Sequence, residues 1–293
     1  MDAEKVMELW PSWWKGYYRL ARVYIFQEEW SEAEKTLDTA VFLNSESKLI
    51  RDELSYVRYK ASLISDNFVT DPFPESTEMV KKELCKVYDL SEEELKDPEK
   101  LAQSLPEIFV NFIKGHQFQH GIYVPEDSKK AVEFYKNSAN LGNAEAMFEI
   151  GKLYLEGKGL KHDFDEAIKW FLQAANSPTT QNIDGIPDAQ HILGVLYFHG
   201  IGVNKNYRKA AEWYKKAVQN GSEESANNLG DLYLQGLGGE QSYMKALCYF
   251  KFGAENGSTG AMINLANCYF MAEGTESNEI TQEYFDEGQL FDI

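Results

Sequence analysis

Apolar and small residues recur along much of the chain with the spacing of amphipathic helices. Ala146, Ile150 and Tyr154 stand at positions i, i+4 and i+8, which places them on one face of a helix. After two loop glycines, a second helical face is formed by Ala167, Trp170, Phe171 and Ala174. Two such helices joined by a short glycine loop predict a helix hairpin.

The hairpin pattern repeats in register along the chain. A loop glycine recurs with separations of 36, 43 and 36 residues, at Gly121, Gly157, Gly200 and Gly236. Four other columns keep this register: an alanine that opens the second helix (Ala131, Ala167, Ala210, Ala246), a large aromatic residue (Phe134, Trp170, Trp213, Tyr249), the aromatic residue beside it (Tyr135, Phe171, Tyr214, Phe250), and a small residue of the first helix (Gly115, Gly151, Gly194, Gly230, Ala266). We expect the small residue to let two helices approach closely and the aromatic pair to fill the space toward the next hairpin. Because one hairpin cannot bury its apolar face alone, the hairpins are expected to stack into a solenoid.

This pattern resembles the Sel-1-like repeat family. The best matching segments are 193–203, LGVLYFHGIGV, and 209–217, KAAEWYKKA. The resemblance covers about 105–272, and we expect a degenerate closing helix around 279–291. It implies an all-α fold, a right-handed α-solenoid of stacked helix hairpins, and a function in assembling larger complexes, including those of protein quality control.

Residues 14–44 follow a different period, which is typical of a tetratricopeptide (TPR) repeat. The matching large and small positions are Tyr17, Leu20, Ala21, Tyr24, Ala33, Leu37 and Ala40. The stretch 47–63 is expected to be the helix that caps such an array, and 2–10 resembles the end of an earlier repeat, so we expect a longer form with upstream repeats. The chain then divides into a partial TPR array at 1–65, an acidic helical linker at 66–104 and a Sel-1-like solenoid at 105–293. In the linker, Ser91 and Glu94 predict a capping box.

The acidic composition narrows the classes of partner. The chain has 29 basic and 47 acidic residues and a formal net charge of −18, so it repels nucleic acids and anionic membrane surfaces. An apolar fraction of 43% allows a real core. Three cysteines with no metal or disulfide spacing, and no apolar run near the roughly 20 residues that span a bilayer, favour a cytoplasmic protein without membrane insertion.

Aligning the repeats places polar and aromatic side chains on the inner face of the first helices. Such side chains suit an extended peptide, because Asn can form hydrogen bonds with its backbone. We therefore expect a peptide-binding groove formed by Phe112, His116, His120, Phe148, Lys152, His191, Phe198, His199, Asn227, Asn228, Asp231, Asn264, Asn267 and Phe270. The alternative interpretation is a face that is merely polar enough for water.

A second candidate site is a row of three cations near the N-terminus, Lys15, Arg19 and Arg22. The segment 11–19, PSWWKGYYR, resembles the third repeat of co-chaperone TPR domains. In that family the matching Lys and Arg help to bind the terminal carboxylates of heat-shock chaperone tails ending in EEVD. The family's other clamp residues, a Lys and two Asn from earlier repeats, are absent, so we interpret the three cations as a carboxylate-clamp remnant or as an ordinary solvated basic stripe.

The histidines raise a third alternative. His116 and His120 have the i, i+4 spacing of metal ligands, but no Glu follows His116 as a zinc-protease helix requires. No nucleophile motif or phosphate-binding loop is present. We expect no catalysis, no cofactor and no metal, and we predict a non-catalytic adaptor or scaffold that holds a protein or peptide on the concave face. The alternatives are a chaperone cofactor that uses the clamp remnant and a metal-binding or enzymatic protein centred on the histidines.

Overall fold

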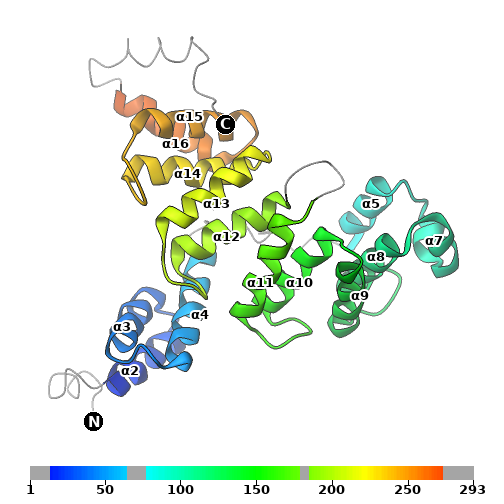
Figure 1. Cartoon of the computed structure of the whole chain (residues 1–293), viewed down its shortest axis with the longest axis horizontal. Helices are drawn as coiled ribbons and strands as arrows, with labels where there is room; N and C mark the ends of the chain where they lie inside the picture. The colour runs from blue at the N-terminus through cyan, green and yellow to red at the C-terminus, as the bar shows by residue number, and fades with distance from the viewer. Residues whose placement is uncertain (1–13, 65–76, 179–184, 273–293) are drawn as a thin grey trace. The chain divides into compact units, whose positions relative to one another are not determined.

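The structure is a computed structural model of the chain, and it describes residues 14–64, 77–178 and 185–272 (Figure 1). These residues form helices and connecting loops, and no β-strand occurs among them. The predicted fold class, an all-α solenoid of stacked helix hairpins, is confirmed. Two expectations lie outside the described residues: the end of an earlier repeat at 2–10 and the closing helix at 279–291.

The chain separates into two compact units. Unit 1 contains Met1–Phe68 and Gln190–Ile293, and unit 2 contains Val69–Ala189. Unit 1 holds three N-terminal helices, α2 (Trp14–Phe26), α3 (Trp30–Leu43) and α4 (Lys48–Ile64). It also holds the helices of the C-terminal hairpins, namely most of α12 (Pro187–His199) and all of α13 (Tyr207–Gln219), α14 (Glu223–Gln235), α15 (Tyr243–Glu255) and α16 (Thr259–Ala272). Grouping in space therefore differs from the order along the sequence, because the N-terminal helices belong with the C-terminal hairpins.

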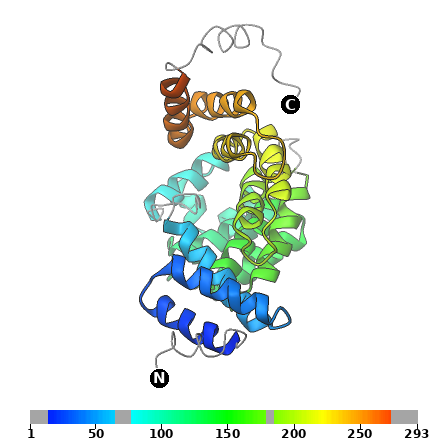
Figure 2. The same cartoon turned by 90° about the vertical axis from the view of Figure 1, so that its left-hand side faces the viewer.

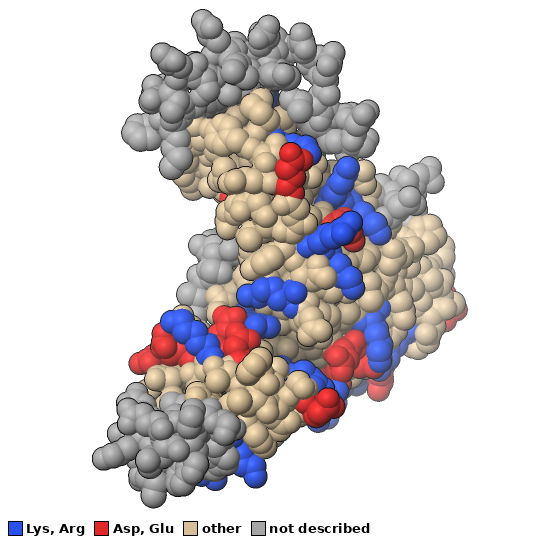
Figure 3. Space-filling model, turned by 60° about the vertical axis from the view of Figure 1, so that its left-hand side comes forward, with Lys and Arg blue, Asp and Glu red and all other residues tan. Residues whose placement is uncertain are grey.

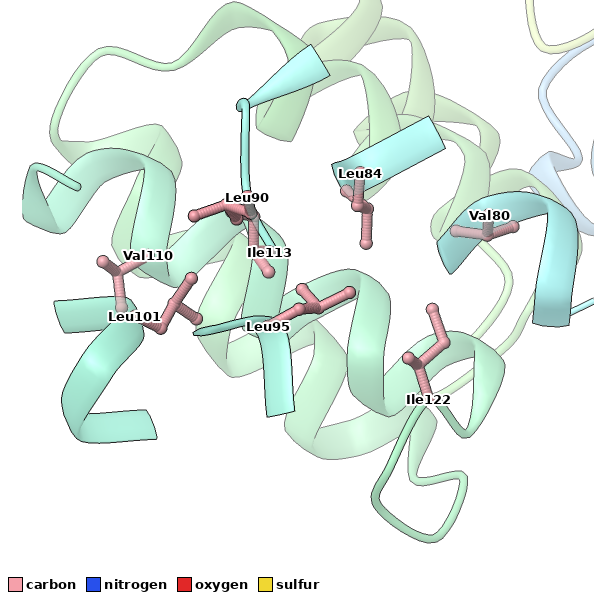
Figure 4. Close-up of a cluster of buried hydrophobic side chains, with 8 residues drawn as sticks. All are labelled: Val80, Leu84, Leu90, Leu95, Leu101, Val110, Ile113 and Ile122. Atoms are coloured by element: carbon pink, nitrogen blue, oxygen red, sulfur yellow. The ribbon is translucent and has the colours of Figure 1, made fainter. Parts of the chain in front are cut away.

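Unit 2 contains three linker helices and two hairpins. The linker helices are α5 (Thr77–Val87), α6 (Glu92–Lys96) and α7 (Pro98–Ser104). The hairpins are α8 (Glu107–His120) with α9 (Ser128–Asn140) and α10 (Ala144–Glu156) with α11 (Phe164–Asn176). The linker helices share one apolar core with α8, formed by Val80, Leu84, Leu90, Leu95, Leu101, Val110, Ile113 and Ile122 (Figure 4). The predicted capping box is present, since Ser91 Oγ accepts from the Glu94 N–H and Glu94 in turn accepts from the Ser91 N–H.

The first helix of each hairpin has a glycine where an aromatic ring of the second helix packs against it, which leaves no room for a side chain. A Cβ atom at Gly151 would lie 2.6 Å from Phe171, and one at Gly194 would overlap the ring of Tyr214. The rings of this column, Tyr135, Phe171, Tyr214 and Phe250, are all buried. In the fifth repeat Ala266 replaces the glycine, and the residue twenty positions later is Asp286 instead of an aromatic residue. The two columns therefore change together within the chain.

The other aromatic column differs from the expectation. Phe134, Trp170, Trp213 and Tyr249 are half-buried. Phe134 stacks on Phe118 with ring centroids 5.5 Å apart, and Tyr249 stacks on Tyr233 at 5.6 Å. These two rings pack on the first helix of their own hairpin, so the fully buried column supplies the tighter packing.

A second loop glycine depends on the hairpin that precedes it. Gly159 has φ +68°, and a Cβ atom there would overlap the carbonyl oxygen of Ser128 at the start of α9. Gly238 stands in the same relation to Tyr207 at the start of α13. In the first repeat this position is Tyr123, which also has positive φ, at 60°. The linker helices, and not a repeat hairpin, directly precede α8, and the Tyr123 hydroxyl lies 3.4 Å from Glu92 of α6.

The three N-terminal helices pack together and bond to the loop that follows α12. They form one group in Figure 2, at the blue end of the colour range. Arg58 Nη1 of α4 donates to the Gly200 carbonyl at 3.1 Å, and Ser55 Oγ accepts from the Gly202 N–H at 3.0 Å. Arg58 also pairs with Glu34 and Asp38, at 3.0 and 2.7 Å. Sequence periodicity did not predict this contact, because it links residues more than 140 positions apart.

Candidate protein-binding face

The predicted groove residues lie on first helices, in two sets that belong to different units. The set of unit 2 lies on α8 and α10, and the set of unit 1 lies on α12, α14 and α16. Within each unit the repeat brings residues about 36 positions apart onto neighbouring helices, so side chains distant in sequence become neighbours.

In unit 2, two histidines stack beside a buried carboxylate. The rings of His116 and His120 are nearly parallel, at 11°, with centroids 5.6 Å apart. Glu149 of α10 is buried and forms an ion pair with Lys152 at 3.1 Å. Burial acts to raise the pKa of Glu149, but Lys152 and the two imidazoles outweigh it, so this pKa lies below its usual value. Burial lowers the pKa of His116 to about 4, so this imidazole is neutral at pH 7.

Glu149 is a member of this face that we did not predict. It occupies the same repeat position as Asn228, 79 residues later (one spacing of 43 and one of 36), and Asn264, another 36 residues on. Comparing this column across all repeats, instead of selecting only its amides, would have identified Glu149.

In unit 1, amide and carboxylate groups link α14 to α16. Asn264 Nδ2 donates to Asn227 Oδ1 at 3.0 Å and to Asp231 Oδ1 at 3.4 Å. Asn228 bonds to the hydroxyl of Tyr214, which is buried. Burial raises the pKa of Asp231 to about 6. The result is a polar network that connects α14 to α16.

Three predicted groove residues are buried and cannot contact a ligand directly. Phe112 and Asn227 are buried, and so is His191, whose Nδ1 lies 2.7 Å from Ser225 Oγ. These residues support the face from below, because the glycine–aromatic packing draws the first helices close to their second helices. The side chain of Phe270 lies outside the described side chains.

The remaining groove residues are at least partly exposed. Asn267 is exposed, and Phe148, Asn228, Asp231 and Asn264 are half-buried. Phe198 and His199 are also half-buried, and Phe198 contacts Tyr207 of its own hairpin with ring centroids 5.2 Å apart. Burial lowers the pKa of His199 to about 4, with Lys205 and Arg58 nearby acting in the same direction.

We expect Asp231→Asn to raise the melting temperature of the protein at pH 7 to 8. The pKa of Asp231 rises on folding from its ordinary 3.8 to about 6. The folded state therefore binds this proton more tightly than the unfolded state, and the ionised group destabilises the fold increasingly as pH rises from about 4 to about 6. The gain from Asn should persist above pH 6 and disappear near pH 4 in thermal unfolding scans. Glu240→Gln, at an exposed loop position, is the control, and equal effects of both variants at every pH would contradict the assignment.

The three N-terminal cations occupy different environments. Lys15, Arg19 and Arg22 of α2 are all exposed. Arg22 Nε lies 3.5 Å from Glu53 of α4, and Lys15 lies 5.5 Å above the ring of Trp14. A ligand carboxylate at Arg22 would have to displace Glu53, so α4 competes with the clamp chemistry that the sequence resemblance implies.

The structure also bears on metal binding, membrane insertion and catalysis. No group of three or more His, Cys, Asp or Glu side chains with metal-ligand geometry occurs in the part of the chain that the structure describes. None of the helices placed in the structure is both long and apolar enough to cross a membrane. A cavity of about 340 Å³, which the sequence did not predict, lies on α5 beside Lys82, Cys85 and Lys86. Burial raises the pKa of Cys85, so this thiol is not an activated nucleophile.

Comparison with known proteins agrees with the repeat pattern. A family model described as Sel1 repeat matches five segments, 117–143, 144–177, 187–222, 223–258 and 259–281. Among solved structures, the chain is similar to a Sel1 repeat protein from Oxalobacter formigenes, with 29% identity and a TM-score of 0.51, covering 65% of this chain and 75% of that one. It is also similar to c5321, a protective antigen of uropathogenic Escherichia coli with an SLR fold, with 26% identity and a TM-score of 0.54, covering 82% of this chain and 44% of that one. A comparison with curated proteins finds no match.

Proposed function

The chain belongs to the Sel1 repeat family, whose members are typically non-enzymatic scaffolds for protein–protein interaction, and on this premise we propose that it is an adaptor that holds an extended segment of a partner protein on its first-helix face. Helical repeats suit this function, because within each unit every further hairpin adds a first helix with exposed side chains beside the preceding one.

The amide and carboxylate network of α14 and α16 is the observation that carries the proposal. Asn264 Nδ2 uses its two hydrogens on Asn227 and Asp231, so Asn264 presents its carbonyl oxygen as an acceptor. Asp231 adds carboxylate oxygens, and the exposed Asn267 lies one turn further along α16. Acceptors held in this way match the N–H groups of an extended peptide, whose backbone pairs with polar side chains in such grooves.

Unit 2 offers a different chemistry on its own first helices. Lys152 lies 5.3 Å above the ring of Phe148 while also bonding to Glu149. A half-buried aromatic ring beside a cation offers one apolar contact and one charged contact. We assign this position to a side-chain contact with a partner, made by unit 2 independently of the α14–α16 network of unit 1.

The redox state of the cysteines supports a cytoplasmic location for this adaptor. Cys85, Cys248 and Cys268 are all unpaired thiols, and burial raises the pKa of each of them. Unreactive free thiols without disulfides are typical of a reducing compartment.

The proposal is tested by selecting peptides from a phage-displayed random library on the intact protein. We expect enriched peptides to bind the wild type and to lose about tenfold in affinity, about 1.4 kcal/mol, with the double variant Asn264→Ala/Asn267→Ala. Asn140→Ala, which removes an exposed amide at the end of α9, is the matched control and should change nothing. Peptides that bind both variants equally, or a library that yields no binder, would contradict the proposal.

A further inference from the structure

The exposed side of α13 is basic, although the chain as a whole is strongly acidic. Between residues 190 and 219 the sequence contains five basic residues and one acidic residue, Glu212, against a formal net charge of −18 for the chain. Arg208, Lys209, Lys215 and Lys216 are all exposed. Figure 3 shows a band of Lys and Arg side chains across the face in view, with Asp and Glu side chains beside several of them.

These cations share one face of α13 because of their spacing. Arg208, Lys215 and Lys216 stand at i, i+7 and i+8, while the opposite face of the helix is buried through Ala210, Tyr214, Ala217 and Val218. An aromatic ring lies within the same stripe, since Trp213 is half-buried and Lys216 Nζ lies 4.3 Å from its ring centroid. Helix geometry therefore fixes four cations and one indole on a single surface.

Neighbouring acidic groups leave most of this charge uncompensated. Arg208 lies 3.8 Å from Glu212, and both side chains are mostly exposed, so this pair is weak. Lys205 is excluded from the stripe, because it faces Glu34 of α3 at 4.0 Å. Lys245 of α15 follows Lys209 by one repeat length of 36 residues and is also exposed, so the basic character continues onto the next hairpin.

We propose that this basic stripe, defined as Arg208, Lys209, Trp213, Lys215 and Lys216, docks an acidic segment of a partner protein that also carries an aromatic residue. The acidic side chains would pair with the lysines, and the aromatic residue would pack against Trp213. A single exposed ion pair contributes about 0–1 kcal/mol, so binding requires several cations acting together. A long polyanion such as nucleic acid is disfavoured, because it would extend over the acidic remainder of the chain.

The test uses a fluorescently labelled peptide of alternating glutamate and tyrosine residues and the full chain. We expect the peptide to bind at low salt, to bind more weakly as ionic strength increases, and to lose about tenfold in affinity with Lys215→Glu/Lys216→Glu. Lys96→Glu/Lys161→Glu is the matched control, because it makes the same change in net charge at two exposed lysines outside the stripe. The control variant tests whether the change in net charge alone weakens binding. A peptide with glutamine in place of glutamate tests whether binding requires the carboxylates.

Three results would overturn the inference. The first is no binding of the acidic peptide by the wild type. The second is an equal loss in the stripe variant and the control variant. The third is tighter binding of a single-stranded oligonucleotide than of the peptide, with the same dependence on Lys215 and Lys216. The double variant Asn264→Ala/Asn267→Ala should leave acidic-peptide affinity unchanged, so failure of the first-helix face and failure of the basic stripe are distinguishable.

Discussion

Tyr214→Ala is expected to lower the free energy of unfolding of the C-terminal hairpins by about 3–5 kcal/mol. The ring of Tyr214 is buried and occupies the space that a side chain at position 194 would otherwise fill. Truncation removes the ring's apolar contacts and leaves a cavity against the glycine, which has no side chain to move into it. The loss should appear as a lower midpoint in urea and as faster amide hydrogen exchange in α12 to α14.

Tyr214→Phe is the control for this result. It keeps the ring and removes only the hydroxyl that bonds to Asn228, so we expect a cost of about 1 kcal/mol. If Phe and Ala were equally destabilising, the hydrogen bond rather than the ring would hold the hairpin together. Packing of the Tyr214 ring against Gly194 would then not explain the stability of this hairpin.

The second large effect is expected for Gly159→Ala in unit 2. The positive φ of this residue costs a side-chain-bearing residue about 1–2 kcal/mol. The added methyl group would also overlap the backbone of Ser128, which cannot move aside as a flexible side chain can, and such overpacking costs about 1–3 kcal/mol more. We expect the loss of stability to be concentrated where the loop after α10 meets the start of α9.

Gly142→Ala separates these two causes. Gly142 has φ +96° but nothing within 4 Å of an added Cβ atom, so it carries the conformational cost without the collision. Thermal unfolding of both variants should therefore place Gly159→Ala clearly below Gly142→Ala. Equal melting temperatures would mean that the loop shifts to relieve the contact, and that the packing of the loop on the preceding hairpin is loose.

The sequence was sufficient to predict the hairpins, because each depends on local spacing. The four loop glycines directly follow first helices and all have positive φ, as their register predicts: Gly121, Gly157, Gly200 and Gly236. The small and aromatic columns were also recognised, but their direct contact, ring into glycine, required coordinates. Periodicity gives the face of a helix and does not give the depth to which a side chain is buried.

The candidate face was predicted less completely for the same reason. His191 and Asn227 align with exposed-face positions in the repeat, yet both are buried where adjacent helices meet. Glu149 was not predicted, although its repeat position is that of Asn264. The contact of Arg58 with Gly200 has no local signature at all, because neither residue belongs to a pattern that includes the other.

The bond from Arg58 to Gly200 has a consequence for biosynthesis. A chain emerges from the ribosome N-terminus first, at about 5–20 residues per second. Gly200 follows Arg58 by 142 residues, so α4 waits about 7–30 s during translation before its acceptor exists. During that interval the side of α2 to α4 that later meets the loop is uncovered, and the nascent N-terminal helices depend on their own small core or on a chaperone to remain unaggregated.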